Sequence, residues 1–265
     1  MKRRAGLIAS VLAAVIALAA VIATPAGAGG IQAGVPPGPA VCGTNWTTIQ
    51  LPSSVFHIYN DDFGGYTCLS TTAGHLGFII TKDTGTGFHA YPNISSGWES
   101  GRYTCTGHTT PCYRYPVQVS HDGAPTVSLA GTLHPGTYNM SLDIWTNKTD
   151  AHPFYSNGTE IMIWLAHPGL KLRNIRWVWI DHATWGTDVW TVHRAGTSWR
   201  LLIYFRARPV TSVTGLRLND FFHNAEYHGY MRSWYWLTAI DAGFELVSGG
   251  VWNNIHYYSL TGLAT

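Results

Sequence analysis

The sequence contains only four glutamates, at positions 99, 160, 226 and 245. Glu160 lies in GTEIMIWL and Glu245 in DAGFELVSGG, where apolar residues alternate with others as in a β-strand. Glu99 lies in the turn-like SGWESGR and Glu226 in a segment with helical spacing, so we interpret both as solvated surface residues. Glu160 and Glu245 are therefore the candidates for chemistry.

The alternation within three expected strands assigns a core face and an opposite face to each, because successive side chains of a strand point in opposite directions. The core face is expected to hold Tyr138, Met140, Leu142, Ile144, Ile161, Ile163, Leu165, Ala242, Phe244 and Leu246. The opposite face is expected to hold Asn139, Ser141, Asp143, Trp145, Glu160, Met162, Trp164, Gly243, Glu245 and Val247.

A carboxylate among apolar and aromatic neighbours is partly desolvated, which raises its pKa, and a second carboxylate nearby raises one of the two further. Two carboxylates with separated pKa values are what glycoside hydrolysis requires. One is ionised and attacks the anomeric carbon, and the other is protonated and donates to the leaving oxygen. Glu160 and Glu245 are 245 − 160 = 85 residues apart. The pattern therefore leaves open whether they meet in space or are ordinary surface glutamates.

Composition restricts the kind of ligand that the protein binds. The chain has 12 Trp and 14 Tyr, only 11% charged residues and a formal net charge of +2. No cluster of Lys and Arg follows the first residues, which argues against a nucleic-acid partner. Abundant aromatic rings suit a flat, neutral ligand such as a sugar, although many of them also fill the core of a β-sandwich.

Short alternating segments between turn signals indicate an all-β fold, a sandwich or jelly roll. The segment TDVWTVHRAGTSWRLLIYF is typical of a hairpin with AGTS as its turn. Only VTGLRLNDFFHNAEYHGY, residues 213–230, has apolar spacing near the helical period, and it predicts one packed helix.

The N-terminus begins with MKRR, continues with a long apolar run and reaches AGA at residues 26–28. This order predicts a signal peptide over residues 1–28 and a secreted protein, with a membrane anchor as the alternative. No later run is apolar enough to span a membrane. Residues 29–41 are a Gly/Pro-rich lead, and residues 42–265 are expected to form one domain.

Four cysteines in an exported chain favour disulfides, and three pairings are possible. Cys105 and Cys112 bracket a tight loop and are expected to pair, which leaves Cys42 with Cys68. Metal ligation with some of the 13 histidines is the alternative, but the cysteine spacing does not match a zinc site. We therefore expect neither a metal nor another cofactor.

GTEIMIWL followed by AGFELVSGG resembles glycoside hydrolase family 12, the endoglucanase family. SLDIW, YNDDFGGYTCLS, AYPNISSG, LNDFF and WYWLTAIDAGFEL also resemble the family's motifs, so that the resemblance covers roughly residues 42–255. It implies a jelly roll of two curved antiparallel sheets with a concave substrate groove, and hydrolysis with retention of configuration through a glycosyl-enzyme intermediate.

The resemblance also implies residue roles. Glu160 is expected to be the nucleophile, Glu245 the general acid/base, and Asp143 the residue that supports Glu160. Asp61 and Phe63 stand where the family usually has Asn and Trp, so sugar binding there is expected to differ. The expected substrate-binding residues are Asn60, Asp61, Phe63, Asn139, Trp145, Tyr155, Met162 and Trp164.

The sequence thus predicts a monomeric, secreted endo-β-1,4-glucanase that cuts internal bonds of cellulose or related β-glucans. A xyloglucan-specific endoglucanase on the same fold is one alternative, and mixed-linkage glucan is another candidate polymer. A non-catalytic sugar-binding sandwich would need the aromatic residues but neither glutamate. A copper oxidase would need His as its first mature residue, whereas the predicted first residue is Gly29.

Overall fold

The computed structural model describes residues 40–43, 48–50, 55–72, 77–99, 102–104, 113–151, 157–172, 175–194 and 196–264. The predicted signal peptide, most of the predicted lead, Tyr155 and the Cys105–Cys112 pair lie outside these residues. Among the described residues, no helix has the length and apolar character needed to cross a membrane.

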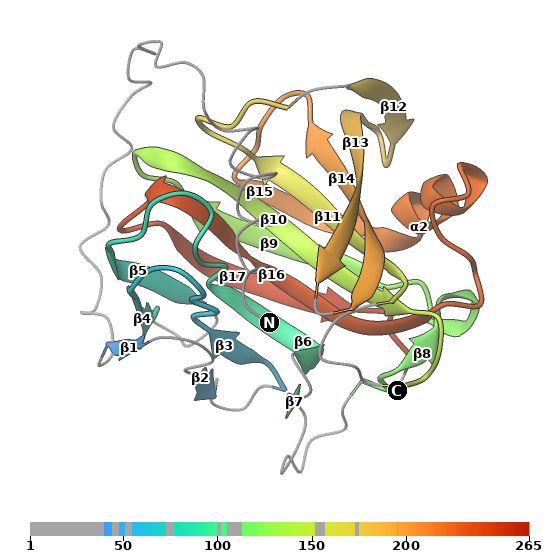
Figure 1. Cartoon of the computed structure of the whole chain (residues 1–265), viewed down its shortest axis with the longest axis horizontal. Helices are drawn as coiled ribbons and strands as arrows, with labels where there is room; N and C mark the ends of the chain where they lie inside the picture. Colours follow the sequence, from blue (N-terminus) through green and yellow to red (C-terminus); the bar gives the residue numbers. More distant parts are fainter. Residues whose placement is uncertain are drawn as a thin grey trace, which may run out of the picture.

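The chain folds into two β-sheets, as predicted, and the longest strands run side by side through the middle of the molecule (Figure 1). The smaller sheet has the order β1 (Val41–Gly43), β4 (Thr67–Thr71), β5 (Phe78–Asp83), β17 (Asn254–Thr261), β9 (Thr126–Thr132), β15 (Ser212–Arg217). The larger sheet has the order β12 (Arg176–Ile180), β13 (Ala183–Arg194), β14 (Thr197–Arg206), β11 (Thr159–Ala166), β10 (Gly136–Asn147), β16 (Trp236–Gly249), β6 (Asn93–Glu99), β3 (His57–Tyr59), β2 (Thr48–Gln50). Short strands β7 (Arg102–Tyr103) and β8 (Val117–Gln118) pair with β6 and β16, and a 3₁₀ turn spans Val119–His121.

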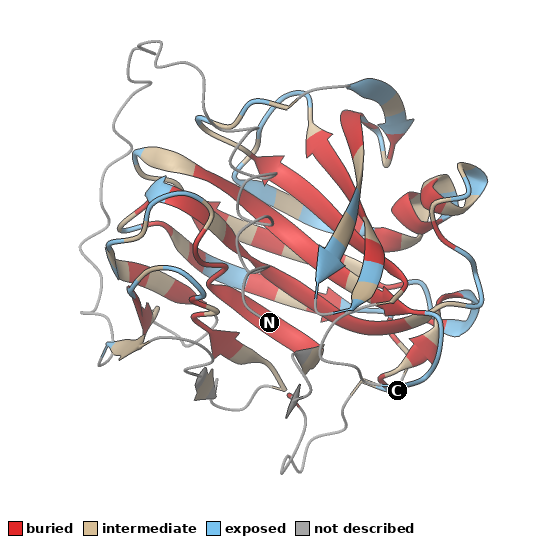
Figure 2. Cartoon of the chain, viewed as in Figure 1, coloured by how far each residue is buried: buried red, intermediate tan, exposed pale blue. Residues whose placement is uncertain are grey.

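Apolar side chains between the two sheets form the core. Every residue assigned to the core face from the alternation of β10, β11 and β16 lies in it. Phe244 of β16 packs edge-on against Phe78 of the smaller sheet and against Tyr138 of β10, with ring centroids 6.0 Å apart in both pairs. The central strands are buried along most of their length, whereas β12 is mostly exposed (Figure 2).

The larger sheet contains one departure from the antiparallel arrangement that we predicted. Strand β11 pairs antiparallel with β10 but parallel with β14. The long connection that a parallel pair requires is made by β12 and β13, which extend the same sheet beyond β14. The predicted hairpin of β13 and β14 is confirmed, but β14 already begins at Thr197, so the connection is shorter than AGTS.

The helix predicted over residues 213–230 is only partly correct. Residues Ser212–Arg217 form β15, which pairs with β9, and the helix α2 spans Leu218–Tyr227. The ladder with β9 satisfies backbone groups that a longer helix would have used, so the helix begins after Arg217. Phe221 on its buried face packs against Trp185 and Tyr204, at centroid distances of 5.0 and 5.1 Å.

The predicted disulfide between Cys42 and Cys68 is present, with an S–S distance of 2.07 Å. It joins β1 to β4, whose ladder places the two cysteines directly opposite one another. The N-terminal strand is thereby attached to the smaller sheet.

Phe244 offers a test of how far the core supports the strand that carries Glu245. It is fully buried between the sheets, so Phe244→Ala removes a ring without an obvious way to refill the space. We expect a loss of about 3–5 kcal/mol in the free energy of unfolding, measured by urea denaturation. The half-exposed ring of Tyr257 is the matched control, and Tyr257→Ala should cost much less. Equal losses in both variants would contradict this packing.

Candidate active site

The candidate catalytic residues lie on the face of the larger sheet that is turned away from the core, here called the outer face. On one edge of β10, Trp145 is opposite Glu160 and Asp143 is opposite Met162. On its other edge, Asn139 is opposite Glu245 and Asp143 is opposite Asp241. Because residues opposite one another in a ladder point to the same side, β10 joins the two glutamates on one face.

Glu160 is buried to 8% exposure, and an indole holds its carboxylate. The Nε1–H of Trp199, at the start of β14, donates a hydrogen bond to Oε2 of Glu160. The same ring lies 5.9 Å from the ring of Trp145, which stands opposite Glu160. Two tryptophans therefore lie near Glu160, and the hydrogen bond from Trp199 stabilises its ionised form.

Sequence analysis did not identify Trp199 as a site residue. Alternation along this segment gives the face on which Trp199, the third residue of β14, lies but not which strand is its neighbour. The contact depends on the parallel pairing of β11 with β14, in which Glu160 is opposite Leu201, two residues after Trp199. Alternation along the sequence does not reveal such a pairing.

Glu245 is half-buried and is held by Asn139. The side-chain amide nitrogen of Asn139 donates to Oε2 of Glu245, while its carbonyl oxygen accepts from Ser141 Oγ at 2.8 Å. The backbone N–H of Glu245 also points to that carbonyl oxygen, at 3.4 Å. These contacts fix the orientation of the amide, so that it presents its N–H group to the carboxylate.

The two glutamates have raised pKa values because both are removed from water. Burial raises the pKa of Glu160 to about 8; the hydrogen bond from Trp199 opposes this rise and the charge of Glu245 adds to it. Burial raises the pKa of Glu245 to about 7, against the hydrogen bond from Asn139. Because the charge of Glu245 adds to the rise in the pKa of Glu160, the two carboxyls do not titrate independently.

Asp143 lies between the two glutamates along β10, and it is almost completely buried. Its Oδ2 accepts a hydrogen bond from Trp145 Nε1 at 3.0 Å. This contact connects Asp143 to the tryptophan that stands opposite Glu160. Direct support of Glu160 by Asp143 stays a prediction.

The predicted binding residues of β11 lie on the outer face but not on an open floor. Met162 and Trp164 are 2% and 6% exposed. They pack in a second apolar cluster with Leu201, Ile203 and Phe205, and the partly buried Leu170 and Leu172 pack against it. Alternation gave the correct face for both side chains but not this packing, which leaves little of either residue for contact with a ligand. Trp145 is only half-buried.

The residues predicted near the start of the domain have different environments. Asn60 is fully buried, and its amide nitrogen donates to the carbonyl oxygens of Gly43 at 2.6 Å and Thr67 at 3.3 Å. These contacts hold the backbone and do not direct Asn60 toward a ligand. Asp61 has a left-handed backbone with φ of 34°. Phe63 is 41% exposed and packs against Phe88 at 4.8 Å, so it is available for contact.

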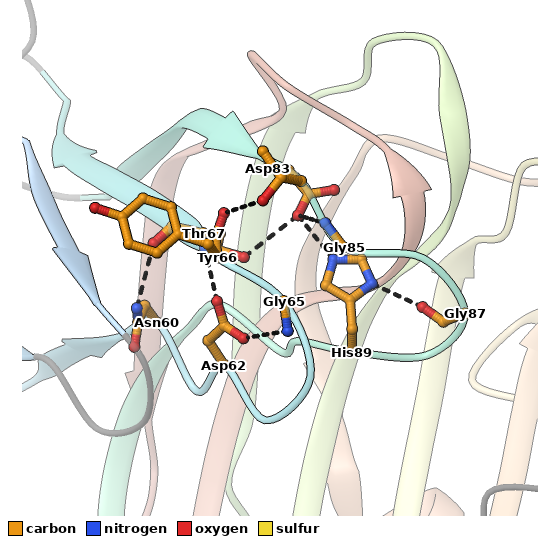
Figure 3. A network of polar contacts seen from close by, with 10 residues as sticks. Asn60, Asp62, Gly65, Tyr66, Thr67, Asp83, Gly85, Gly87 and His89 are labelled. Atoms are coloured by element: carbon orange, nitrogen blue, oxygen red, sulfur yellow. Dashed lines mark hydrogen bonds and ion pairs between the residues drawn. The ribbon is translucent and has the colours of Figure 1, made fainter.

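A polar network fixes the two loops that carry Phe63 and Phe88 (Figure 3). Asp62 accepts hydrogen bonds from the backbone N–H groups of Gly65 at 2.8 Å and Thr67 at 2.6 Å. His89 Nε2 lies 2.7 Å from Asp83 Oδ1, and its Nδ1 lies 2.7 Å from the carbonyl oxygen of Gly87. Both partners are acceptors, so both ring nitrogens donate and the ring is an imidazolium.

The pKa of the His89 ring is raised above its ordinary value. Burial disfavours the charged ring, but the hydrogen bonds to Asp83 and Gly87 outweigh burial and raise the pKa. A Cβ on Gly85 would lie 1.9 Å from the ring, so only glycine fits beside it. Ala90, the next residue, bridges to Asp62 and to Leu246, the residue after Glu245. The network therefore ties the Phe63 loop to the strand that carries Glu245.

The fold is that of a glycoside hydrolase of the β-sandwich type. The model of glycosyl hydrolase family 12 matches residues 70–261, which is most of the chain. The protein belongs to this family.

Known proteins agree with that assignment. The chain is 26% identical over 169 residues to Endoglucanase S from Pectobacterium parmentieri, covering 60% of this chain and 61% of the relative's length. Endoglucanase cel12A from Rhodothermus marinus is 27% identical, with a TM-score of 0.72 over 84% of this chain and 98% of that structure. A family 12 xyloglucanase from Bacillus licheniformis shares the fold at 19% identity, with a TM-score of 0.72 over 84% of this chain and 99% of that structure.

The raised pKa of Glu160 makes stability depend on pH. The pKa is 4.5 for an ordinary glutamate and about 8 in the fold, so the folded protein retains a proton that the unfolded chain releases. This contribution to stability is fully present below about pH 4.5 and is lost as the pH rises through about 8. Glu160→Gln removes the titration. As the pH rises from about 5 to about 9, the free energy of unfolding of the unmodified protein should fall relative to that of the variant, by at most about 5 kcal/mol.

Urea denaturation at a series of pH values measures this difference. Glu226→Gln, on the surface of α2, is the matched control because it makes the same chemical change away from the site. A difference between Glu160→Gln and the unmodified protein that stays constant over the whole range would contradict the raised pKa.

Proposed function

We propose that the protein is a secreted, retaining endo-β-1,4-glucanase that hydrolyses internal bonds of cellulose or a related β-glucan. The observation that carries the proposal is the presence of two electrostatically linked carboxyls, the buried Glu160 and the half-buried Glu245, on the outer face of a family 12 sandwich. Endoglucanases among its relatives support the activity, and the basic, apolar and small-residue order of residues 1–28 supports secretion.

In the proposed first step, ionised Glu160 attacks the anomeric carbon while protonated Glu245 gives its proton to the departing glycosidic oxygen. The carbon–oxygen bond to the leaving sugar breaks and a glycosyl ester to Glu160 forms. In the second step, Glu245 takes a proton from water, whose oxygen attacks the same carbon and releases Glu160. The first step uses the singly protonated form in which the proton is on Glu245, whereas in the absence of substrate Glu160 has the higher pKa of the two.

The contacts of each carboxyl support this division of roles. Glu160 accepts from the indole of Trp199, which favours the ionised form that a nucleophile requires. Glu245 is the more exposed of the two, so its proton can be exchanged with water between the two steps. Asn139 orients Glu245 from the adjacent strand.

Substitution of the two glutamates tests the proposed activity. Glu160→Gln should abolish hydrolysis of soluble barley-type β-glucan, and Glu245→Gln should lower kcat by roughly 10²–10⁴-fold. Both effects are measured as released reducing ends. Glu226→Gln is the matched control and should retain full activity, and circular dichroism checks that each variant is folded. Normal turnover by Glu160→Gln would refute the assignment.

The products of the unmodified protein decide between the remaining alternatives. Retention predicts that the first product seen by proton NMR has the β configuration, and an α product would refute the covalent intermediate. Barley-type β-glucan, carboxymethylcellulose and xyloglucan are tested in parallel. Xyloglucan is the second candidate substrate, because Phe63 departs from the family's usual Trp and xyloglucanases share the fold. Binding of polymer without release of sugar would identify a non-catalytic sugar-binding protein.

Trp199 provides a further prediction. Trp199→Phe keeps an aromatic ring beside Trp145 but removes the N–H group that donates to Glu160. The ionised form of Glu160 then loses its donor, so its pKa rises further. The acidic limb of the pH profile of kcat/KM should move upward by about one pH unit, which corresponds to roughly 1.4 kcal/mol. An unchanged limb would show that the hydrogen bond does not set the charge of Glu160.

A further inference from the structure

The rings of Phe63 and Phe88 form an aromatic corner near the strand that carries Glu245. Their centroids are 4.8 Å apart and the two rings are inclined by 56°. Phe63 is 41% exposed and Phe88 is partly exposed, so both rings are open to a ligand. Sequence analysis identified Phe63 but gave no role to Phe88.

Backbone bridges connect this corner to the catalytic face. Ala90 bridges to Leu246, the residue after Glu245, and on its other side to Asp62. Two spacings between strands, about 10 Å, therefore separate the Phe63 segment from β16. Ala90 lies in the core, so Phe63, which follows the partner Asp62, points to the outer side of the sheet. A glucan chain bound at Glu245 extends beyond the bond that is cut, and this corner lies within its reach.

His89 joins the two loops that carry the rings. It follows Phe88 in the chain, and its carbonyl oxygen accepts from the backbone N–H group of Phe63 at 2.9 Å. Its ring lies between Asp83 Oδ1 and the carbonyl oxygen of Gly87, each at 2.7 Å (Figure 3). His89 therefore holds Phe63 through its backbone and the Phe88 loop through its ring.

The contacts of this ring require its positive charge. The side chains of His89 and Asp83 are each 1% exposed and form an ion pair. A neutral ring has a single N–H group, so one of its nitrogens would face an acceptor with no proton between them. The titratable groups on the segments that adjoin the ring are those of Asp61, Asp62, Tyr66, Lys82, Asp83 and Glu245. Burial disfavours the protonated ring, and the charges of Asp83 and Asp62 favour it.

We propose that Phe63 and Phe88 form one two-ring surface on which a sugar residue of the glucan stacks, and that protonated His89 is the positioning residue that keeps the two rings together. Loss of the ring proton removes one of its two hydrogen bonds and leaves Asp83 as a buried charge without its cation, so the two loops separate. The stacking of a sugar rests on the proposed function, whereas the dependence of the ring contact on His89 does not.

Proton NMR tests this dependence without any activity. Nuclear Overhauser contacts between the rings of Phe63 and Phe88 should weaken as the pH rises and His89 loses its proton. Asp83→Asn keeps an acceptor oxygen but removes the charge, so the contacts should weaken at a pH lower by roughly one unit. His89→Gln should lack them at every pH, and the exposed His256 provides the matched control, His256→Gln. Ring contacts that persist in every variant and at every pH would overturn the role of His89.

Calorimetry with cellohexaose tests the sugar surface, in a Glu160→Gln background in which hydrolysis does not consume the ligand. Phe88→Ala and Phe63→Ala should each weaken binding by about tenfold, and the double variant should lose less than the product of the two. Tyr257→Ala removes an exposed ring from the smaller sheet and should leave the affinity unchanged.

Unchanged binding by Phe88→Ala would overturn the two-ring surface. Losses that multiply in the double variant would show two separate contacts and would overturn it as well. A background that binds no cellohexaose would contradict the proposed function and the stacking of a sugar, while the NMR result for His89 would stand by itself.

Kinetics on barley-type β-glucan separate positioning from folding. His89→Gln and Phe88→Ala should raise KM by about tenfold and leave kcat within about twofold, because they weaken binding without touching the glutamates. Asp83→Asn replaces His89→Gln if the latter does not fold, and its KM should begin to rise at a lower pH than that of the unmodified protein. A fall in kcat with an unchanged KM would overturn the positioning role of His89.

Discussion

Strand β10 is hydrogen-bonded to β11 along one edge and to β16 along the other, and these two ladders place both glutamates on one side of the sheet. A slip of one residue in either ladder would exchange the two faces of the slipped strand. Glu160 or Glu245 would then enter the core that Phe244 and Tyr138 fill. The packing between the sheets therefore determines the register of these ladders, and the register places both glutamates on the outer face.

The same arrangement concentrates acidic groups where water is scarce. Asp143, Glu160 and Asp241 are all nearly buried on the outer face, and Glu245 is half-buried beside them. Removing charged groups from water costs free energy unless they are neutralised or receive hydrogen bonds. Hydrogen-bond donors such as Trp199 and Asn139 reduce that cost, and the large apolar core offsets the remainder. Active sites commonly violate local rules of stability in this way.

Alternation along each strand was sufficient to predict the core face and the outer face of β10, β11 and β16, because it depends only on local geometry. Alternation does not predict which distant strands pair with one another. Trp199 reaches Glu160 through a parallel ladder, and Asp241 meets Asp143 through an antiparallel register with bulges, neither of which alternation specifies. The burial of Met162 and Trp164 likewise depends on Leu170 and Leu172, from a connection outside the strands.

The helix illustrates the same limit. The apolar spacing of residues 218–225 correctly gave a helix whose Phe221 and Phe222 are buried. The preceding residues have similar composition but are used by β9 as a ladder partner. The local apolar spacing identified the helix, and the pairing of β15 with β9 determines where the helix begins.

The parallel pairing of β11 and β14 also bears on how this fold can diverge. Glu160 is held by β10 on one side and by β14 on the other, and the chain between these contacts leaves through β12 and β13. The connections outside the ladders can therefore lengthen, shorten or change composition without moving the nucleophile candidate relative to Trp145 or Trp199. Strand β12, whose Trp177 and Trp179 are exposed, is separated from β14 by β13, so its exposed side chains can change without altering the contacts that hold Glu160.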